Sequence, residues 1–294
     1  MTRNILVPLD GTESEANLSE VQRITTPEDR IHFLHVVPPV PAPAGLPVSH
    51  LIGLLEQALA YLQTTRQKSL PGRRGLDLVR SGDAAQEILG VALEKNIHLI
   101  AMSTHARTGL GRFLLGSVAA KVVEASQLPV LLVRPTLPRL STALRQILVA
   151  VEGSETSSDL LETVKTLAAP STAEIILFHA VEPVADPSPQ WRSGPLAILS
   201  TPEHRLQDLA DRLEQEGYVA WPVVSQGAPV EEILRQARRL DVDLIALATH
   251  ARSGLERMLD GSVAEGVLKE SPVPVLLQKP LRARKTVLEG EHHA

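Results

Sequence analysis

The chain has 294 residues, 44% of them hydrophobic and 21% charged, and its formal net charge is −5. Because it contains no cysteine, disulfides, thiolate zinc sites and a cysteine nucleophile are excluded. Its apolar runs are shorter than the roughly 20 residues of a membrane helix, and its first residues enter a strand too early for a signal peptide. Interspersed charges and few aromatic residues argue against nucleic acid as a partner. We expect a cytoplasmic protein without membrane contact.

The first half of the chain alternates strand-length apolar runs with helical patterns. Nearly continuous apolar runs are typical of parallel strands that are covered on both faces. We expect strands at residues 5–9, 31–37, 76–80, 99–102 and 130–133, and helices at residues 14–24, 51–62, 84–93 and 117–125. This alternation predicts a parallel sheet with right-handed crossovers and helices on both faces.

The second half of the chain repeats the first. The segment from Thr104 to Pro135 returns at Thr249 to Pro280 with 19 of 32 positions identical, and the opening NILVPLDGTESE returns from Gln146 as QILVAVEGSETS. Such similarity indicates an internal duplication, and each copy has the size of one compact core. We expect two domains at residues 1–138 and 143–281, followed by a C-terminal tail at residues 282–294.

Each half carries one long, proline-rich loop after its second expected strand. These loops start at Pro38 and at Glu182. Loops of this kind leave the carboxyl end of a parallel sheet, where open α/β folds bind ligands. We therefore expect both loops to be lids over binding sites.

In both halves an apolar strand is followed by a polar loop, a Gly-Ser pair and a helix. The pairs are Gly116-Ser117 and Gly261-Ser262. A glycine followed by a small hydroxyl residue at a helix start combines free amides, the positive end of the helix dipole and a hydroxyl donor, so it favours anion binding. The alternative is an ordinary helix N-cap at Ser117 or Ser262.

The stretches ILVPLDGTESE, LIAMSTHARTGLGRFLLGSV and PVLLVRP resemble a universal stress protein domain, and their counterparts in the second half resemble another. The resemblance covers nearly the whole chain as a tandem protein. It implies an α/β fold of two tandem, doubly wound, five-stranded parallel-sheet domains of the Rossmann-like, adenine-nucleotide-hydrolase-like type. It also implies a stress-response module, in a family whose members divide into those that bind ATP and those that do not.

The family's deciding motif for ATP is G-x-x-G, nine residues, then G-S or G-T, and this chain keeps it in part. By resemblance, the motif maps to Ser103, Ala106, Gly116 and Ser117 in the first half and to Ala248, Ala251, Gly261 and Ser262 in the second. Glycines in such a loop permit positive φ and let backbone amides approach phosphate oxygens. Whether Ser103 and Ala106 disturb the loop depends on its conformation, because alanine is strained only in left-handed geometry.

The resemblance also implies contacts for the nucleoside. Asp10 matches the family's aspartate near the ribose, and the adenine pocket falls around Val36 and Val37. The alternative for Asp10 is a turn or helix-capping role. Glu152 replaces the aspartate in the second half, where Asp260 adds a negative charge beside the Gly-Ser pair. We therefore expect adenine nucleotide, as ATP with or without a divalent metal ion on its phosphates, to prefer the first half.

No catalytic or protein-bound metal constellation is evident in the sequence. His105 and His250 each stand in a short polar loop without a second ligand or partner at a matched spacing. G-x-S-x-G, H-E-x-x-H and a full Walker loop are missing from the sequence. We expect no enzyme beyond slow ATP hydrolysis, which leaves two functions: a nucleotide-binding stress module, or a stress-linked scaffold of the same fold that does not bind ATP.

The last strand of each half is apolar, as PVLLVRP and PVLLQKP, and each would end its own sheet. Unpaired apolar edges are a liability. We expect Val130–Val133 and Val275–Gln278 to pair antiparallel. The two halves would then imitate, as an intrachain pseudo-dimer, the homodimer that the resemblance implies for single-domain members, and a homodimer of the whole chain is a further option.

Overall fold

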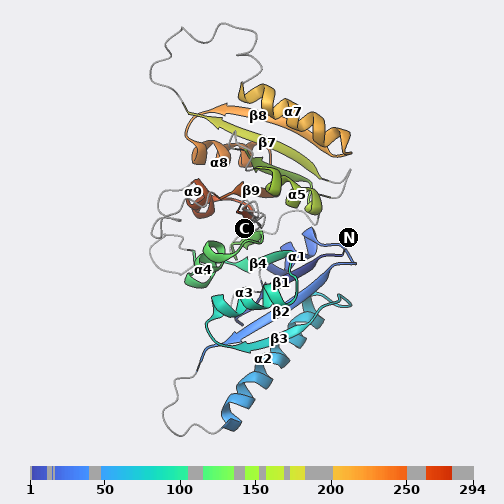
Figure 1. The fold of residues 1–294 in the computed structure, drawn as a ribbon, viewed down its shortest axis with the longest axis vertical. Coiled ribbons are helices and arrows are strands. Elements are labelled where there is room, and N and C mark those ends of the chain that lie inside the picture. The colour runs from blue at the N-terminus through green and yellow to red at the C-terminus, as the bar shows by residue number, and fades with distance from the viewer. Residues whose placement is uncertain are drawn as a thin grey trace, which may run out of the picture.

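The structure is a computed structural model of the chain (Figure 1). It describes residues 2–11, 15, 17–39, 48–104, 115–135, 143–151, 157–168, 173–182, 201–249 and 263–279. Among these residues, no helix is both long enough and apolar enough to cross a membrane.

Strands and helices alternate through both halves. The first half contains β1 (Asn4–Pro8), α1 (Leu18–Ile24), β2 (Arg30–Val37), α2 (Val48–Ser69), β3 (Asp77–Ser81), α3 (Ala84–Glu94), β4 (Leu99–Ser103), α4 (Ser117–Ala125) and β5 (Val130–Val133). The second half contains β6 (Gln146–Ala150), α5 (Ser157–Leu167), β7 (Glu174–Val181), α7 (Pro202–Gln215), β8 (Val219–Gln226), α8 (Pro229–Arg239), β9 (Leu244–Ala248), α9 (Val263–Glu270) and β10 (Val275–Gln278).

All ten described strands form one sheet, in the order β3-β2-β1-β4-β5-β10-β9-β6-β7-β8. Within each half the described strand pairs are parallel, whereas β5 and β10 pair antiparallel at the junction, with Leu131 opposite Leu276. The sequence prediction that these two strands pair antiparallel is confirmed. Each half therefore loses one apolar edge, and the sheet continues from one half into the other (Figure 1).

Helices cover both faces of this sheet, which explains why the strands are apolar on both sides. On one face, α1, α2, α5 and α7 bury residues such as Val21, Leu62 and Leu206 against the strands. On the other face, α3, α4, α8 and α9 do the same with residues such as Ile88 and Val267. Each of these two cores contains residues of both halves, so burial of apolar area ties the halves together.

Two cations cross between the halves to the ends of helices. The Arg134 guanidinium follows β5 and donates from Nη2 to the carbonyl oxygens of Leu268 (3.1 Å) and Ser271 (2.8 Å) at the end of α9. The Lys279 ammonium follows β10 and donates to the Glu124 carbonyl at the end of α4. Positive charge is favourable at a helix C-terminus, where carbonyls lack helical partners.

A buried ion pair makes a further link on the opposite side of the junction. Arg23 on α1 lies 3.1 Å from the Asp243 carboxylate and donates to the Asp243 carbonyl at 2.8 Å. The same carboxylate accepts the backbone N–H groups of Arg145 and Gln146 at the start of β6. The Arg23 and Asp243 side chains are only 3% and 2% exposed, so this contact depends on both halves being folded.

Candidate functional site

The candidate site lies where the direction of the chain through the sheet reverses. In the first half, β1 lies between β2 and β4. Helices α1 and α2 cover one face, and α3 and α4 cover the other. In a doubly wound sheet, the carboxyl ends of two neighbouring strands whose helices lie on opposite faces form a binding crevice. In this half the rule places the candidate crevice between β1 and β4.

Asp10 leaves the sheet at the carboxyl end of β1. The strand ends at Pro8, and the Leu9 N–H still donates to the Leu34 carbonyl at 2.8 Å. Gly11 then turns the chain with a φ of +80°, a conformation that glycine adopts without steric cost. The Asp10 side chain is exposed at this turn, beside the carboxyl end of β1.

The other side of the crevice comes from β4 and α4. Ser103 ends β4 and is buried, and the Thr104 N–H after it donates to the Val133 carbonyl at 2.9 Å. Gly116 is the N-cap of α4, with φ −56° and ψ 148°, and Ser117 is the first helical residue and is exposed. The alternative considered from the sequence, that Ser117 is an ordinary helix N-cap, is therefore wrong, because Gly116 holds that position. Because glycine has no side chain, the cap itself provides no oxygen for the first helical amides.

Val36 and Val37 lie at the carboxyl end of β2, the strand next to β1. The Val36 side chain packs against the core under α3 and α4, and Val37 is buried. The Val37 carbonyl already accepts the Gly82 N–H at 3.2 Å. Both residues therefore have local structural roles at the carboxyl end of β2, where the sequence predicts the adenine pocket.

The second half is described only in part at the corresponding place. Ala248 ends β9, and the Thr249 N–H donates to the Gln278 carbonyl at 2.8 Å, as its counterpart does in the first half. Other predicted site residues lie outside the described residues: Ala106, Glu152, Ala251, Gly261 and Ser262.

Sequence reasoning missed a histidine next to this crevice. The His35 ring on β2 places Nδ1 2.8 Å from the Leu9 carbonyl oxygen, directly before Asp10. The second half repeats the contact, since Nδ1 of His179 on β7 lies 2.6 Å from the Val151 carbonyl. The signal was present, because the strands IHFLHVV and IILFHAV carry a histidine at the same position.

The charges beside α4 are compensated. Asp83, the N-cap of α3, lies 3.2 Å from Lys121 on α4. The pKa of the Asp83 carboxyl lies below its usual value because the Gln86 N–H and then Lys121 stabilise the charged form. Among the described residues, no group of three or more His, Cys, Asp or Glu side chains could hold a metal ion.

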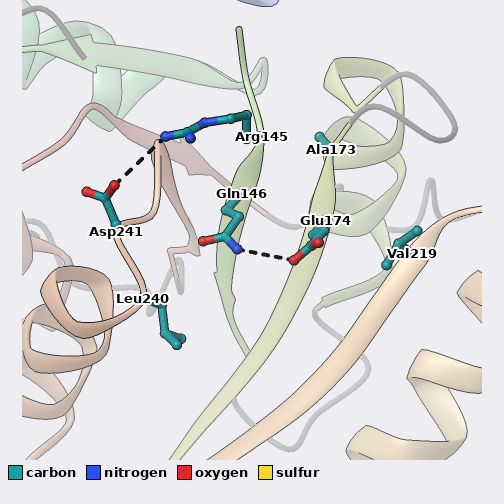
Figure 2. Close-up of a pocket in the computed structure, with 7 residues that line it drawn as sticks. All are labelled: Arg145, Gln146, Ala173, Glu174, Val219, Leu240 and Asp241. Carbon is teal, nitrogen blue, oxygen red and sulfur yellow. Dashed lines mark hydrogen bonds and ion pairs between the residues drawn. The ribbon is translucent and has the colours of Figure 1, made fainter. Parts of the chain in front are cut away.

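A cavity of about 440 Å3 lies elsewhere, at the amino ends of strands in the second half (Figure 2). It is lined by Arg145, Gln146, Ala173, Glu174, Val219, Leu240 and Asp241. Its polar side chains pair with one another: Gln146 donates to Glu174 at 3.2 Å, and Arg145 lies 3.8 Å from Asp241. The cavity contains none of the predicted site residues, and it lies at the amino ends of strands, whereas the candidate site lies at the carboxyl ends.

The first half fills the corresponding place with a carboxylate. Asp29, which precedes β2 as Ala173 precedes β7, accepts from the backbone N–H and the guanidinium of Arg3, with a shortest distance of 2.5 Å. Ala173 cannot make such bonds, so Arg145, the counterpart of Arg3, lies 57% exposed beside the hollow. The cavity therefore lies where the two copies differ in their side chains.

Comparisons with known proteins agree with the tandem arrangement. The model of the universal stress protein family matches residues 1–134 and again residues 143–279. A universal stress protein of Mycolicibacterium smegmatis is 25% identical over 292 residues, covering 94% of this chain and 97% of that protein. Universal stress protein YxiE of Bacillus subtilis is 29% identical over 147 residues, covering 45% of this chain and 97% of its own. A crystal structure of a universal stress protein from Archaeoglobus fulgidus superimposes with a TM-score of 0.74, at 20% identity, over 94% of this chain and 98% of that chain.

Proposed function

Because the chain belongs to the universal stress protein family, we propose that it is a tandem stress-response module that binds ATP in the crevice of its first half. The observation that carries the proposal is that two complementary groups follow the neighbouring strands β1 and β4, at the switch point of the sheet. An exposed carboxylate, Asp10, follows β1, and a helix start capped by Gly116 follows β4. A carboxylate suits ribose hydroxyls, and helix amides suit phosphates.

The residues present fit this nucleotide in their chemistry. The amides at the start of α4 and the Ser117 hydroxyl would hold phosphate, and Asp10 would accept from the ribose. Val36 and Val37 would border the adenine. Ser103 and Ala106, where the family's motif has glycines, would line the loop between them. A divalent metal ion, if bound, would arrive with the phosphates.

The second half is the weaker site in this proposal. Its residues are Glu152, Ala248, Ala251, Gly261 and Ser262. The longer Glu152 side chain displaces the ribose acceptor, and Asp260 repels phosphate. The predicted domain bounds, the pseudo-dimeric relation of the halves, a homodimer of the chain, the cytoplasmic location and the lid at residues 38–49 belong to the same proposal.

In this function ATP is an effector and not a substrate for rapid turnover. Binding to the folded state raises its stability in proportion to the logarithm of free ATP above the dissociation constant. We expect hydrolysis far below about ten per second, a common enzyme value. The competing function is a scaffold of the same fold whose crevice holds no ATP.

Calorimetry on the full chain decides between these functions. Gly116→Asp should weaken ATP binding about 100-fold or more, because like charges repel by roughly 4 kcal/mol at 4 Å near a protein surface. The backbone of Gly116 suits other residues, and aspartate is a favourable N-cap, so the variant should fold. Gly116→Asn has the same shape without the charge and should weaken binding far less.

Gly261→Asp is the matched change in the second half and should leave most of the ATP binding intact. Equal losses from Gly116→Asp and Gly261→Asp would contradict the preference for the first half. If the unmodified chain binds no ATP, the scaffold function replaces the one proposed.

A further inference from the structure

In both halves a histidine side chain bonds to the backbone carbonyl of the residue that follows the first strand. The His35 Nδ1 to Leu9 oxygen distance is 2.8 Å, and the His179 Nδ1 to Val151 oxygen distance is 2.6 Å. A carbonyl oxygen can only accept, so Nδ1 carries the proton and donates in both cases. The same bond at equivalent positions of two copies that otherwise differ in sequence points to a shared geometric role.

The bond sits where the regular ladder between the strands ends. Leu9 N–H donates to the Leu34 carbonyl, and Val151 N–H donates to the Phe178 carbonyl, each at 2.8 Å. In a continuing parallel ladder, the next bond would run from a backbone N–H of β2 to the Leu9 carbonyl. Here the His35 imidazole supplies a donor to that carbonyl, just before the chain turns away at Gly11.

This bond sets the direction in which Asp10 leaves the sheet. The carbonyl of residue 9 and the N–H of residue 10 belong to one planar trans peptide, in which they point in opposite directions. Because the Leu9 carbonyl is directed at β2, the Asp10 N–H is directed away from β2, toward the side on which β4 lies. The Tyr61 ring of α2 packs edge-on against His35, with centroids 5.9 Å apart, and limits the orientations of the imidazole.

We infer that His35 is a positioning residue for ribose recognition. By holding the Leu9 carbonyl, it fixes the peptide that carries Asp10, so that the carboxylate meets the ribose hydroxyls of a nucleotide bound in the crevice. The inference rests on the proposed function and extends it, because it assigns part of the preference for ribonucleotides to a side chain that does not itself contact the ligand. His179 makes the same bond in the second half, but there it precedes Glu152.

The test compares ATP with 2′,3′-dideoxy ATP by calorimetry on the full chain. If the wild type prefers ATP by about tenfold, that preference corresponds to about 1.4 kcal/mol of recognition of the hydroxyls. His35→Phe should keep the ring shape but lose the donor, so the preference should fall to that of Asp10→Asn. His35→Asn places an amide N–H near the position of Nδ1 and should restore much of the preference. His179→Phe is the matched control and should leave it unchanged.

A role in packing alone would give a different result. In that case His35→Phe would weaken ATP and dideoxy ATP by the same factor, and the double variant with Asp10→Asn would show additive losses. Either result would overturn the positioning role. We expect instead that His35→Phe weakens the binding of ATP and not of dideoxy ATP. The double variant should then show no smaller preference for ATP than either single variant.

Hydrogen exchange without nucleotide separates this inference from the proposed function. In His35→Phe, the Leu9 amide, which donates the last ladder bond to the Leu34 carbonyl, should exchange about tenfold faster than in the wild type, and in His35→Asn it should exchange at nearly the wild-type rate. Unchanged exchange in His35→Phe would overturn the inference even if ATP binds. Absence of ATP binding by the wild type would overturn the ribose role together with the proposed function, and faster exchange would then show that His35 still holds the turn.

Discussion

At the carboxyl ends of their strands the two halves repeat one another, whereas at the amino ends they differ. His35 and His179 both bond to the carbonyl that follows the first strand of their half. At the amino end, Asp29 holds Arg3 in the first half, whereas Ala173 in the second leaves a cavity beside Arg145. The histidine bonds, which both halves share, satisfy backbone carbonyls at fixed positions of the fold. The contacts that differ between the halves are charge pairs, which can be arranged in several ways.

A different carboxylate accepts the backbone N–H groups at the start of the first strand of the second half. Asp243 accepts the backbone N–H groups of Arg145 and Gln146 and also meets Arg23 of the first half. The counterpart of Asp243 in the first half is His98, whose Nδ1 accepts the Asn4 N–H at 3.1 Å. At this place the second half thus keeps an internal bond to the start of its first strand and adds a contact with the first half.

The largest effect on stability is expected at Asp29. It is 1% exposed and paired with an Arg3 side chain that is 11% exposed. Asp29→Asn should lower the free energy of unfolding by about 3 kcal/mol, because breaking a buried pair leaves its partner uncompensated. The control is Asp241→Asn, which removes an 85% exposed carboxylate 3.8 Å from Arg145 and should cost close to zero. Equal losses in urea unfolding would contradict the comparison.

The same carboxylate should make stability depend on acid pH. Burial alone would raise the pKa of Asp29, but the Arg3 side chain, the backbone N–H groups of Thr26 and Arg3, and the Arg3 charge together lower it. A lowered pKa in the folded state gives stability that is complete above the ordinary value of about 3.9 and is lost as the pH falls through the folded value. The difference between wild type and Asp29→Asn should therefore be constant near neutral pH and shrink below about pH 4. A difference that grows in acid would contradict this assignment.

A smaller effect is expected from the cations that cross the junction. Arg134→Ala removes two bonds to carbonyls at the end of α9 and should cost about 2 kcal/mol, whereas Lys279→Ala removes one bond to Glu124 and should cost about 1 kcal/mol. Hydrogen exchange should rise in the last turn of α9 for the first variant and of α4 for the second. The control is Arg80→Ala, which breaks an exposed pair with Glu94 and should change neither helix.

The sequence predicts much of the fold and less of the site. Apolar runs predict every strand of the first half to within one residue at each end, because strands buried on both faces leave a local signal. The sequence prediction for α2 is too short, since the helix runs to Ser69 through polar residues. Its last turns are held by contacts that no local pattern encodes: Arg66 bonds to Asp77 and to the Ile31 and Leu76 carbonyls.

In the candidate site, too, features of the local sequence were predicted and contacts between distant residues were not. The order of strands and the Gly-Ser pair predict where Asp10 and Gly116 lie in the chain, because Asp10 comes two residues after the end of β1 and Gly116 directly precedes α4. The role of His35 was not predicted, since within an apolar run its ring gives no sign of the carbonyl that it meets in the folded chain. The cavity beside Ala173 was not predicted either, because a hollow arises from the side chain that one copy lacks.

The smallest effect concerns the N-caps of two equivalent helices. Asp83 caps α3 by accepting the N–H groups of Ala85 and Gln86, whereas Ala228 precedes α8 with nearly the same backbone angles, φ −65° and ψ 130° against φ −69° and ψ 123°, and makes no side-chain cap bond. Ala228→Asp should therefore raise the free energy of unfolding by about 1 kcal/mol, and Asp83→Ala should lower it. Ala228→Asn provides the same acceptor without the charge, so any advantage of Asp over Asn measures the helix dipole. If Ala228→Asp leaves the urea midpoint unchanged while Asp83→Ala lowers it, the starts of α3 and α8 are not equivalent. The structural similarity of the two halves would then not extend to the N-cap of these helices.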